Sequence, residues 1–293
     1  MNGDTARSRS GSVDGQVLGP GRLAQIACLL EVTARKPGNV HRFADLPGLP
    51  FSDFLLSATA IAEPLDRAAT AGIGRAVFEA IEATRRVVST NTNLGIVLLL
   101  APLAAVSMNV DLQDGIEAVL AATTVEDARW VYRAIRLAEP GGLGDVPAQD
   151  VKDEPTVTLR EAMAMAADRD LIARQYADGY RAVFDDALPP LRRTLTEGWP
   201  LDTAIVTGYL HVLARHPDSL VVRKHGPAVA RLVSDGAAQL LDARWPEALD
   251  SESRCQEFDA WLRQPSHRFN PGTSADLVTA ALFAALRDGT MQL

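Results

Sequence analysis

Lysine, cysteine and aromatic residues are all scarce in this sequence, and the scarcity narrows the kinds of protein it encodes. Three of the 29 basic residues are lysines, aromatic residues make up 5%, and 37 acidic residues leave a net charge of −8. An acidic chain does not suit a general nucleic-acid or acidic-membrane surface, so we expect neither partner. Cys28 and Cys255 lie far apart in the sequence, which argues against a disulfide framework and favours a reducing cytoplasm.

Long apolar runs and common nucleotide-binding motifs are also missing. The longest apolar run, 94–108, is shorter than the roughly 18 residues of a membrane span, so we interpret it as a buried core helix. No Walker loop, no G-x-G-x-x-G after a strand and no G-x-S-x-G occurs. The five histidines show no metal-ligand spacing, and we expect no structural zinc. Residues 1–20 are polar and lack a signal-peptide core, which predicts a disordered leader.

Apolar residues recur at helical spacing along most of the chain, while alternating strand patterns are almost absent. We therefore predict an all-α fold: one multi-helix globular domain over 21–293, with a polar cleft at the helix ends. The longest predicted loop, 140–155, is either a domain boundary or a mobile flap. The predicted helices cover 21–35, 51–69, a stretch between Gly72 and Ser89, 94–108, 111–121, 124–138, 158–187, 190–197, 201–215, 226–242 and 254–263, and a last one follows the segment 268–276.

The segment from Glu31 to His41 places a carboxylate, an amine and a tight turn at the end of the first predicted helix. Pro37 ends that helix because the residue before a proline is disfavoured in the α region, and Gly38 permits positive φ. Lysine is rare here and differs from arginine as a compact point charge, so Lys36 is a candidate functional cation. The alternative is a helix C-cap in which Lys36 interacts with the last carbonyl groups.

Three further polar segments lie next to predicted helices. The first, 89–93, is polar enough for ligand contact, but its short side chains are also typical of a helix cap, the interpretation we favour for it alone. The second, 218–226, is predicted as a loop whose Arg223 and Lys224 make a local cationic site suited to phosphate oxygens.

The third segment, 270–276, has the strongest physical signal for an anion site. Gly272 lets a ligand approach the backbone, Ser274 is a candidate cap, and Asp276 is expected in the first turn of the last helix. A plain capping pair of Thr273 and Asp276 is the alternative.

Taken in this order, the segments resemble the triphosphoribosyl-dephospho-CoA synthase family, which makes the precursor of the citrate lyase and malonate decarboxylase prosthetic group. The likeness extends from about residue 24 to residue 290. Its specific parts are Glu31-Val with Lys36-Pro-Gly38, Asp53 followed by Ser57-Ala58, Asn91-Thr92 before an apolar helix, Arg223 with Gly226, and Pro271-Gly272 with Ser274-Ala-Asp276-Leu.

The resemblance implies that the helical domain is catalytic and transfers the triphosphoribosyl group of ATP to a hydroxyl of 3′-dephospho-CoA, releasing adenine. Such a reaction needs carboxylates near the ribose, a group for the departing base, and Mg²⁺ with cations for the triphosphate. ATP and dephospho-CoA or a related nucleotide are then the small-molecule partners, and a homodimer is the candidate assembly.

The resemblance also suggests a role for each matching residue. Glu31, Asp53 and Asp276 are the predicted catalytic residues, with Glu31 and Asp53 also predicted to bind metal. Lys36, Arg223 and Lys224 are assigned to phosphate, and Ser274 acts with Asp276 toward the ribose or the metal. The other predicted substrate-binding residues are Gly38, Asn39, Ser57, Asn91, Thr92, Asn93 and Gly272.

Three departures from the family pattern keep alternatives open. The chain has Asn91-Thr-Asn-Leu-Gly95 where the family has Asn-Thr-His-Lys-Gly, so a histidine and a cation are missing. It keeps only Asp53 of a Ser-His-x-Asp-Met segment, and no Gly-Ala-Arg-Gly-Glu segment occurs near 175–185. The alternatives are a related ribosyl or phosphoribosyl transferase acting on another coenzyme precursor, and a non-catalytic helical protein that binds nucleotide. Adenine release separates these possibilities, and a binding protein need not gather its acidic side chains in one cleft.

Overall fold

This computed structural model describes residues 12–13, 16–140 and 149–291. Most of these residues are in helices. The predicted all-α class is confirmed. Of the predicted disordered leader, residues 1–11 and 14–15 lie outside the described residues. Two short antiparallel strands, β1 (Ser12–Val13) and β2 (Gln16–Val17), precede the first helix.

Many of the helices follow one another closely, and the longer connections lie between α1 and α2 and between α8 and α9. The first half of the chain contains α1 (Pro20–Thr33), α2 (Phe51–Ala60), α3 (Ala62–Asp66), α4 (Ala68–Ala71), α5 (Ile73–Val87), α6 (Leu94–Ala105), α7 (Leu112–Ala121) and α8 (Val125–Ala138). The second half contains α9 (Leu159–Ala164), α10 (Leu171–Asp178), the π-helical segment η1 (Ala182–Ala187), α11 (Leu188–Thr196), α12 (Leu201–Arg215), α13 (Ser219–His225), α14 (Pro227–Asp242), α15 (Ser251–Arg263) and α16 (Gly272–Arg287).

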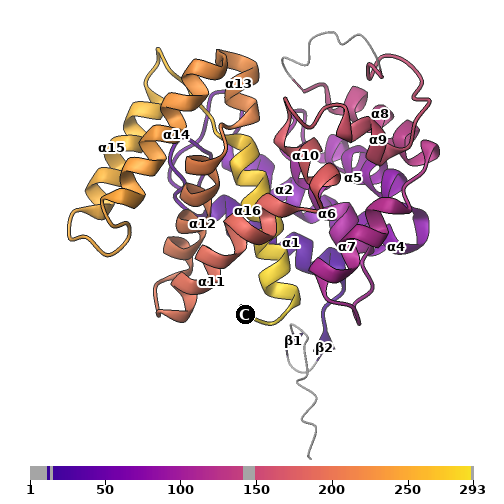
Figure 1. The fold of residues 1–293 in the computed structure, drawn as a ribbon, viewed down its shortest axis with the longest axis horizontal. Helices are drawn as coiled ribbons and strands as arrows, with labels where there is room; N and C mark the ends of the chain where they lie inside the picture. Colours follow the sequence, from indigo (N-terminus) through magenta and orange to yellow (C-terminus); the bar gives the residue numbers. More distant parts are fainter. Residues whose placement is uncertain (1–11, 14–15, 141–148, 292–293) are drawn as a thin grey trace, which may run out of the picture.

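Helices α6 and α16 form the centre of the molecule. Both are apolar on nearly every face, and a helix without a polar face is stable only when other helices surround it. Helix α16 packs against α1, α6 and α12, with α11, α12, α14 and α15 on one side of it and α5 to α10 on the other (Figure 1). This arrangement surrounds both helices with protein and places their first turns near each other.

The prediction of a single helix over 51–69 is wrong, because the segment is divided into α2, α3 and α4. Pro64 explains the first break, since its nitrogen carries no hydrogen to donate to the carbonyl of Ala60. Helix α2 still begins at Phe51 with Asp53 in its first turn, as the sequence predicted. The capping pair Thr124 and Asp127 at the start of α8 is confirmed as a full capping box.

Two further boundaries were predicted wrongly. The expected helix over 158–187 is interrupted by Asp170, which caps α10, and by Gly179, which ends α10 at a φ of 72°. The segment 218–226 was predicted as a loop, but it contains helix α13, whose start is capped by the Asp218 carboxylate. A helix of seven residues shows too few turns for its apolar period to be recognised.

The connection between α8 and α9 contains the predicted long loop, of which residues 141–148 lie outside the described residues. Tyr132 of α8 donates a hydrogen bond to the carbonyl of Gln149 at 2.8 Å, which ties the described end of this connection to the helix. Within the described ranges, no helix combines the length and apolar character needed to span a membrane.

Candidate active site

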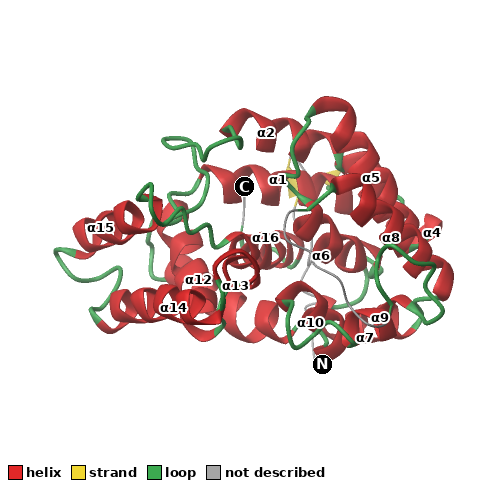
Figure 2. Ribbon diagram, turned by 90° about the horizontal axis from the view of Figure 1, so that it is seen from above, coloured by secondary structure: helices red, strands yellow, loops and turns green. Residues whose placement is uncertain are grey.

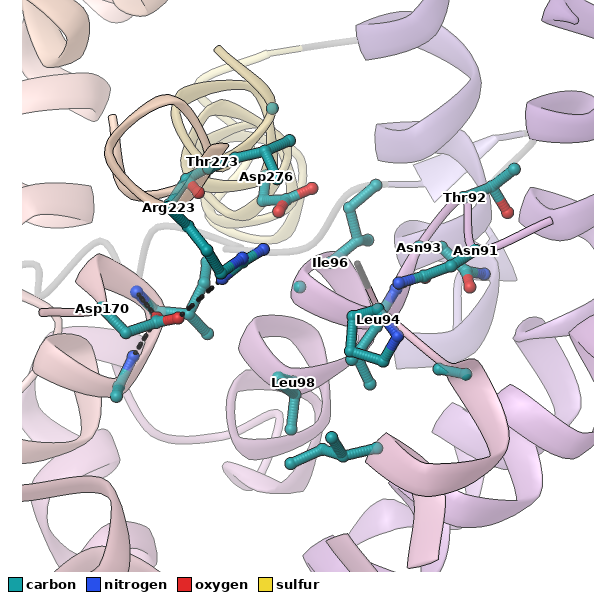
Figure 3. A pocket seen from close by; sticks show the side chains of 18 of the residues that line it. Asn91, Thr92, Asn93, Leu94, Ile96, Leu98, Asp170, Arg223, Thr273 and Asp276 are labelled. Carbon is teal, nitrogen blue, oxygen red and sulfur yellow. Dashed lines mark hydrogen bonds and ion pairs between the residues drawn. The ribbon is translucent and has the colours of Figure 1, made fainter. Parts of the chain in front are cut away.

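A cavity of about 730 Å³ lies where α6 and α16 begin. Figure 2 shows α6, α10, α13 and α16 around this part of the molecule, and Figure 3 shows the side chains that line the cavity. Nine of the residues proposed from the sequence line it, namely Glu31, Asn39, Asn91, Thr92, Asn93, Arg223, Lys224, Gly272 and Asp276. The other five, Lys36, Gly38, Asp53, Ser57 and Ser274, are not among the lining residues.

Asp276 reaches the cavity from α16, which begins a turn earlier than predicted. The helix starts at Gly272 after Pro271, and neither Thr273 nor Asp276 caps it, so the alternative of a Thr273–Asp276 capping pair is wrong. The Asp276 carboxylate therefore points into the cavity (Figure 3). A Cβ atom at Gly95 would lie 2.1 Å from Asp276 Oδ2, so only glycine lets the first turn of α6 approach this carboxylate so closely.

Asp276 and Glu31 influence each other electrostatically. Burial raises the pKa of Asp276 well above its usual value, and the negative charge of Glu31 raises it further, while Arg223 opposes the shift. Burial also raises the pKa of Glu31, against the effect of the Lys36 ammonium. Two carboxyl groups in this relation do not readily ionise together, so the pair is able to retain a proton at higher pH than a free carboxyl group.

Lys36 lies behind Glu31 and is completely buried. Its ammonium donates hydrogen bonds to the carbonyls of Glu31 at 2.6 Å and Ala34 at 3.2 Å, and a longer one to Val40. The ammonium also lies 3.0 Å from Glu31 Oε1, although this buried oxygen accepts no well-aligned hydrogen bond from the described residues. Lys36 therefore occupies the end of α1, as the C-cap alternative expected.

The turn after Lys36 presents Asn39 to the cavity. Gly38 has a φ of 73°, and its N–H donates to Asp259 Oδ1 at 2.7 Å. A Cβ atom there would meet Leu262 and the backbone of Phe269 at 2.8 Å, so both conformation and space require glycine. Asn39 Nδ2 donates to Asn270 Oδ1 at 2.9 Å, which joins this turn to the segment before α16.

The segment 89–93 lines the opposite wall, and α2 and α5 support it. Ser57 Oγ lies 2.6 Å from Thr92 Oγ1, and Thr90 donates to Asp53 Oδ2 at 3.0 Å. Ser57 and Asp53 thus contact residues that line the cavity. The segment also makes a capping contact of the kind that its short polar side chains predicted, because Asn91 Oδ1 accepts the N–H of Leu94 at 3.2 Å.

Arg223 and Lys224 reach the cavity from the last turn of α13, where helix polarity favours cations. Arg223 faces Asn91 and Asn93 across the cavity and lies 3.6 Å from Asp170 Oδ2 (Figure 3). Asp170 was missed from the sequence, although an aspartate directly before the apolar run 171–173 is a typical N-cap signal. Arg85 and Arg169 also line the cavity, and no motif distinguishes them from the other arginines.

Ser274 belongs to the layer behind the cavity wall. Its N–H and hydroxyl both donate to Asp218 Oδ2, at 2.7 and 2.9 Å. Oδ1 of the same aspartate accepts the N–H groups of Leu220 and Val221. Asp218 therefore joins the starts of α13 and α16, and its carboxylate has four donors within the protein.

The described residues provide no cluster of three or more histidine, cysteine or acidic side chains able to hold a metal ion by themselves. Glu31 and Asp276 both line the cavity, and each could contribute carboxylate oxygens as ligands. Mg²⁺ bound with a polyphosphate commonly uses one or two protein carboxylates, with phosphate oxygens and water as the remaining ligands. The pair therefore fits a metal that arrives with a phosphorylated substrate.

The fold and the site define a protein of the all-α class with a cavity of small-molecule size that combines cations, amides and carboxylates. The family described as CitG: ATP:dephospho-CoA triphosphoribosyl transferase matches residues 19–293. The chain belongs to this family, and the resemblance found in the sequence is confirmed.

Relatives and a solved structure agree with this membership. A protein of Pseudomonas putida, named probable 2-(5''-triphosphoribosyl)-3'-dephosphocoenzyme-A synthase, is 29% identical over 223 residues, which is 76% of this chain and 71% of the relative. A protein of the same name from Pseudomonas fluorescens is 31% identical over 111 residues, 38% of each chain. The crystal structure of a putative triphosphoribosyl-dephospho-CoA synthase from Archaeoglobus fulgidus matches with a TM-score of 0.63 and 28% identity, covering 81% of this chain and all of that one.

Proposed function

We propose that the protein transfers the triphosphoribosyl group of ATP to a hydroxyl of 3′-dephospho-CoA and releases adenine. The names of the family and of its relatives indicate this activity. The observation that carries the proposal here is the meeting of Arg223 and Lys224 with the carboxylates of Glu31 and Asp276 in one cavity. A polyphosphate sugar requires this combination, because its phosphates need cations and its reacting carbon needs nearby carboxylates.

The reaction breaks the bond between ribose C1′ and adenine N9 and forms a bond between C1′ and the acceptor oxygen. The electron pair of the broken bond stays on adenine, and the proton of the acceptor hydroxyl is the one that adenine gains overall. Positive charge develops on the sugar as the bond lengthens. Ionised carboxylate stabilises that charge, and a carboxyl group that holds or takes a proton serves the leaving base or the acceptor.

We assign these tasks to the carboxylates of the cavity wall. Asp276 lies at the first turns of both central helices and is assigned to the sugar and its proton transfers. Glu31 is assigned to the positive charge of the sugar and to the metal, because it lines the same cavity as Asp276. Asp53, predicted as a catalytic and metal residue, is assigned an indirect role, because it contacts the wall through Thr90.

The phosphates are assigned to Arg223 and Lys224, which line the cavity. The first N–H groups of a helix attract anions, but those of Leu94 and Ser274 already bond Asn91 Oδ1 and Asp218 Oδ2. Gly272 serves packing rather than ligand approach, because a Cβ atom there would lie 2.8 Å from Leu220 Cδ2. Asn39, Asn91 and Asn93 supply amides. Ser57 and Ser274 support the wall through Thr92 and Asp218, and Gly38 and Lys36 shape the turn that carries Asn39.

Mg²⁺ bound with ATP would be held by Glu31 and Asp276 together with the phosphate oxygens, and it would neutralise part of the triphosphate charge. The sequence predicted Glu31 and Asp53 as the metal-binding residues. We propose Asp276 in place of Asp53, because Asp53 is not among the cavity-lining residues. Action in the cytoplasm and assembly as a homodimer stay predictions from the sequence.

A transfer to another coenzyme precursor is the second candidate. The position of the family lysine is occupied by Leu94, which is 8% exposed and supplies no charge. A donor or acceptor with one fewer anionic group would suit this wall equally well. The convergence of Glu31 and Asp276 in one cavity, meanwhile, favours either transferase over a non-catalytic binding protein.

Purified protein incubated with ATP, MgCl₂ and dephospho-CoA should release adenine and increase the acceptor mass by one triphosphoribosyl group. Glu31→Gln should lower the rate of adenine release about 100-fold, and Asp53→Asn about 10-fold, by loss of charge at and behind the wall. Asp235→Asn is the matched control, because Asp235 is exposed on α14 and is not a lining residue; its rate should equal that of the unaltered protein.

The outcomes distinguish the candidates. Adenine release with another precursor but not with dephospho-CoA would replace the proposal by the second candidate. If ATP binds but no adenine is released with any acceptor tested, the protein is a nucleotide-binding protein without transferase activity. Full turnover by Glu31→Gln would remove Glu31 from the proposed machinery.

A further inference from the structure

One wall of the cavity is apolar, and it contacts none of the phosphate, sugar or metal groups placed so far. Helices α8, α9 and α10 supply most of this wall, and α6 completes it with Leu98, which lies apart from Asp276 and Arg223 in Figure 3. We call it the aliphatic wall and define it by Leu98, Ile135, Ala138, Ala162, Met163 and Ile172.

Among the described residues near the aliphatic wall, the polar side chains of Tyr132, Gln149 and Arg169 are hydrogen-bonded within the protein. The Tyr132 hydroxyl donates to the carbonyl of Gln149, and the Gln149 side chain bonds both the N–H and the hydroxyl of Thr156. Arg169 donates to the carbonyl of Met165 at 3.0 Å. A ligand portion that lies on this wall must therefore gain most of its affinity from apolar contact, with its polar atoms directed toward the cavity opening.

We infer that the aliphatic wall binds the purine base of the donor nucleotide. This inference rests on the proposed function. Of the three parts of ATP, the triphosphate would lose hydration on an apolar wall where Arg169 is already bonded to the Met165 carbonyl, whereas the other side of the cavity offers both Arg223 and Lys224. The ribose must lie where its C1′ faces Asp276. The base is planar and apolar on both faces, so it gains from burial while its polar edge reaches the opening.

The pantetheine portion of the acceptor is the competing occupant. Its amide groups lie along a flexible chain, and each would need a hydrogen-bond partner once buried. Because the polar side chains of Tyr132, Gln149 and Arg169 are already hydrogen-bonded within the protein, the wall favours the base over this chain. The acceptor would then approach C1′ from the side of the cavity opening.

The aliphatic wall also affects the departure of the base. When the C1′–N9 bond breaks, the electron pair remains on adenine, and an adenine anion against an apolar surface would lack compensating charge. Neutral adenine fits the same surface well. The wall therefore requires adenine to receive its proton as it leaves, and that proton is supplied overall by the acceptor hydroxyl.

Direct binding of fragments tests the inference without turnover. Free adenine, inorganic tripolyphosphate and pantetheine are each titrated into the intact protein by calorimetry. Adenine should bind, and Ala162→Leu should weaken it at least 10-fold by filling the wall, while tripolyphosphate binding changes less than twofold. Ala164→Leu is the matched control, since Ala164 is exposed on the same helix α9 and does not line the cavity.

A second variant, Ala138→Leu, fills the wall from α8 and should show the same selective loss, so the test does not depend on one helix. Unchanged adenine affinity in both wall variants, or weakened pantetheine with unchanged adenine, would overturn the inference. Absence of adenine binding to the unaltered protein would overturn it as well. These results are distinct from failure of the proposed function, in which adenine binds but ATP and dephospho-CoA release none.

Discussion

The cavity wall and the layer directly behind it contain the same kinds of residue but differ in how those residues are paired. In the backing layer, the Asp218 carboxylate accepts four hydrogen bonds, and the Lys36 ammonium binds three carbonyls. On the wall, Glu31 is paired with one cation, the Lys36 ammonium 3.0 Å from its Oε1, and the alternative capping contact of Asp276 does not form. Buried polar groups are normally satisfied, so wall carboxylates with few protein partners are suited to a ligand.

Buried carboxylates in the two layers also differ in how they affect the stability of the folded protein. A fully paired carboxylate contributes to folding, because removing it leaves several donors without an acceptor. A poorly paired carboxylate next to another one is a cost to folding that a ligand cation or a developing positive charge can offset. Substitutions on the wall should therefore change activity more than stability, and substitutions behind it should do the reverse.

The largest expected effect is the loss of catalytic rate caused by the substitution Asp276→Asn. The amide keeps the shape of the side chain but removes charge and proton exchange next to the reacting sugar. We expect the rate of adenine release to fall about 10³-fold, roughly 4 kcal/mol in transition-state stabilisation. Steady-state kinetics measures the rate, and a thermal melt should show a midpoint equal to or above that of the unaltered protein.

Asp218→Asn is the control for that substitution, because the chemical change is the same in the backing layer. It places an NH₂ group against backbone and hydroxyl donors and should cost about 2 kcal/mol in the free energy of unfolding. Equal losses of stability in the two variants would contradict the distinction between wall and backing layer.

The next largest effect concerns Lys36 and its pairing with Glu31. Lys36→Met should lower the free energy of unfolding by about 3 kcal/mol, because it leaves a buried carboxylate without its cation and three carbonyls without a donor. Urea unfolding measures the change. The double variant with Glu31→Gln should lose less than the sum of the single variants, and strict additivity would show that the ion pair is not a coupled unit.

The smallest effect is a pH dependence of stability from His41 in the turn after Asn39. Burial, and next the positive charge of Arg263, lower the pKa of His41 to about 4, although Asp259 acts in the opposite direction and Lys36 and Arg35 add to the lowering. The unfolded chain, with its pKa near 6.5, therefore binds the proton more readily than the folded protein. His41 contributes stability that is complete above pH 6.5 and is lost as the pH falls toward 4.

His41→Asn isolates this contribution. The asparagine oxygen can still accept the N–H of Phe43, which His41 Nδ1 accepts at 3.2 Å. Between pH 7 and pH 5 the unaltered protein should lose about 1.5 kcal/mol more stability than the variant, as measured by urea unfolding at each pH. Parallel pH profiles would show that His41 does not titrate as its surroundings predict.

Helix positions could be predicted where the apolar period covers several turns or a cap precedes it. This holds for the helices near 73–87 and 201–215 and for the capping box at Thr124. It fails for α13, which is short, and for the stretch after 158, where tertiary contacts stabilise separate short helices. The candidate residues were recognisable by type and order, but pattern alone could not place Glu31 on the wall and Lys36 behind it.

The sequence by itself determined the helical class, the burial of the apolar run 94–108 and the family, because apolar periodicity and ordered motifs are local properties of the chain. Only the tertiary structure decided which polar residues face the cavity. Asp218 and Asp276 are both aspartates near helix starts, and the local pattern around them does not show how many donors each carboxylate meets. Their difference arises because the fold directs four donors at Asp218 and brings Gly95 and Glu31 toward Asp276, and such convergence depends on segments distant along the chain.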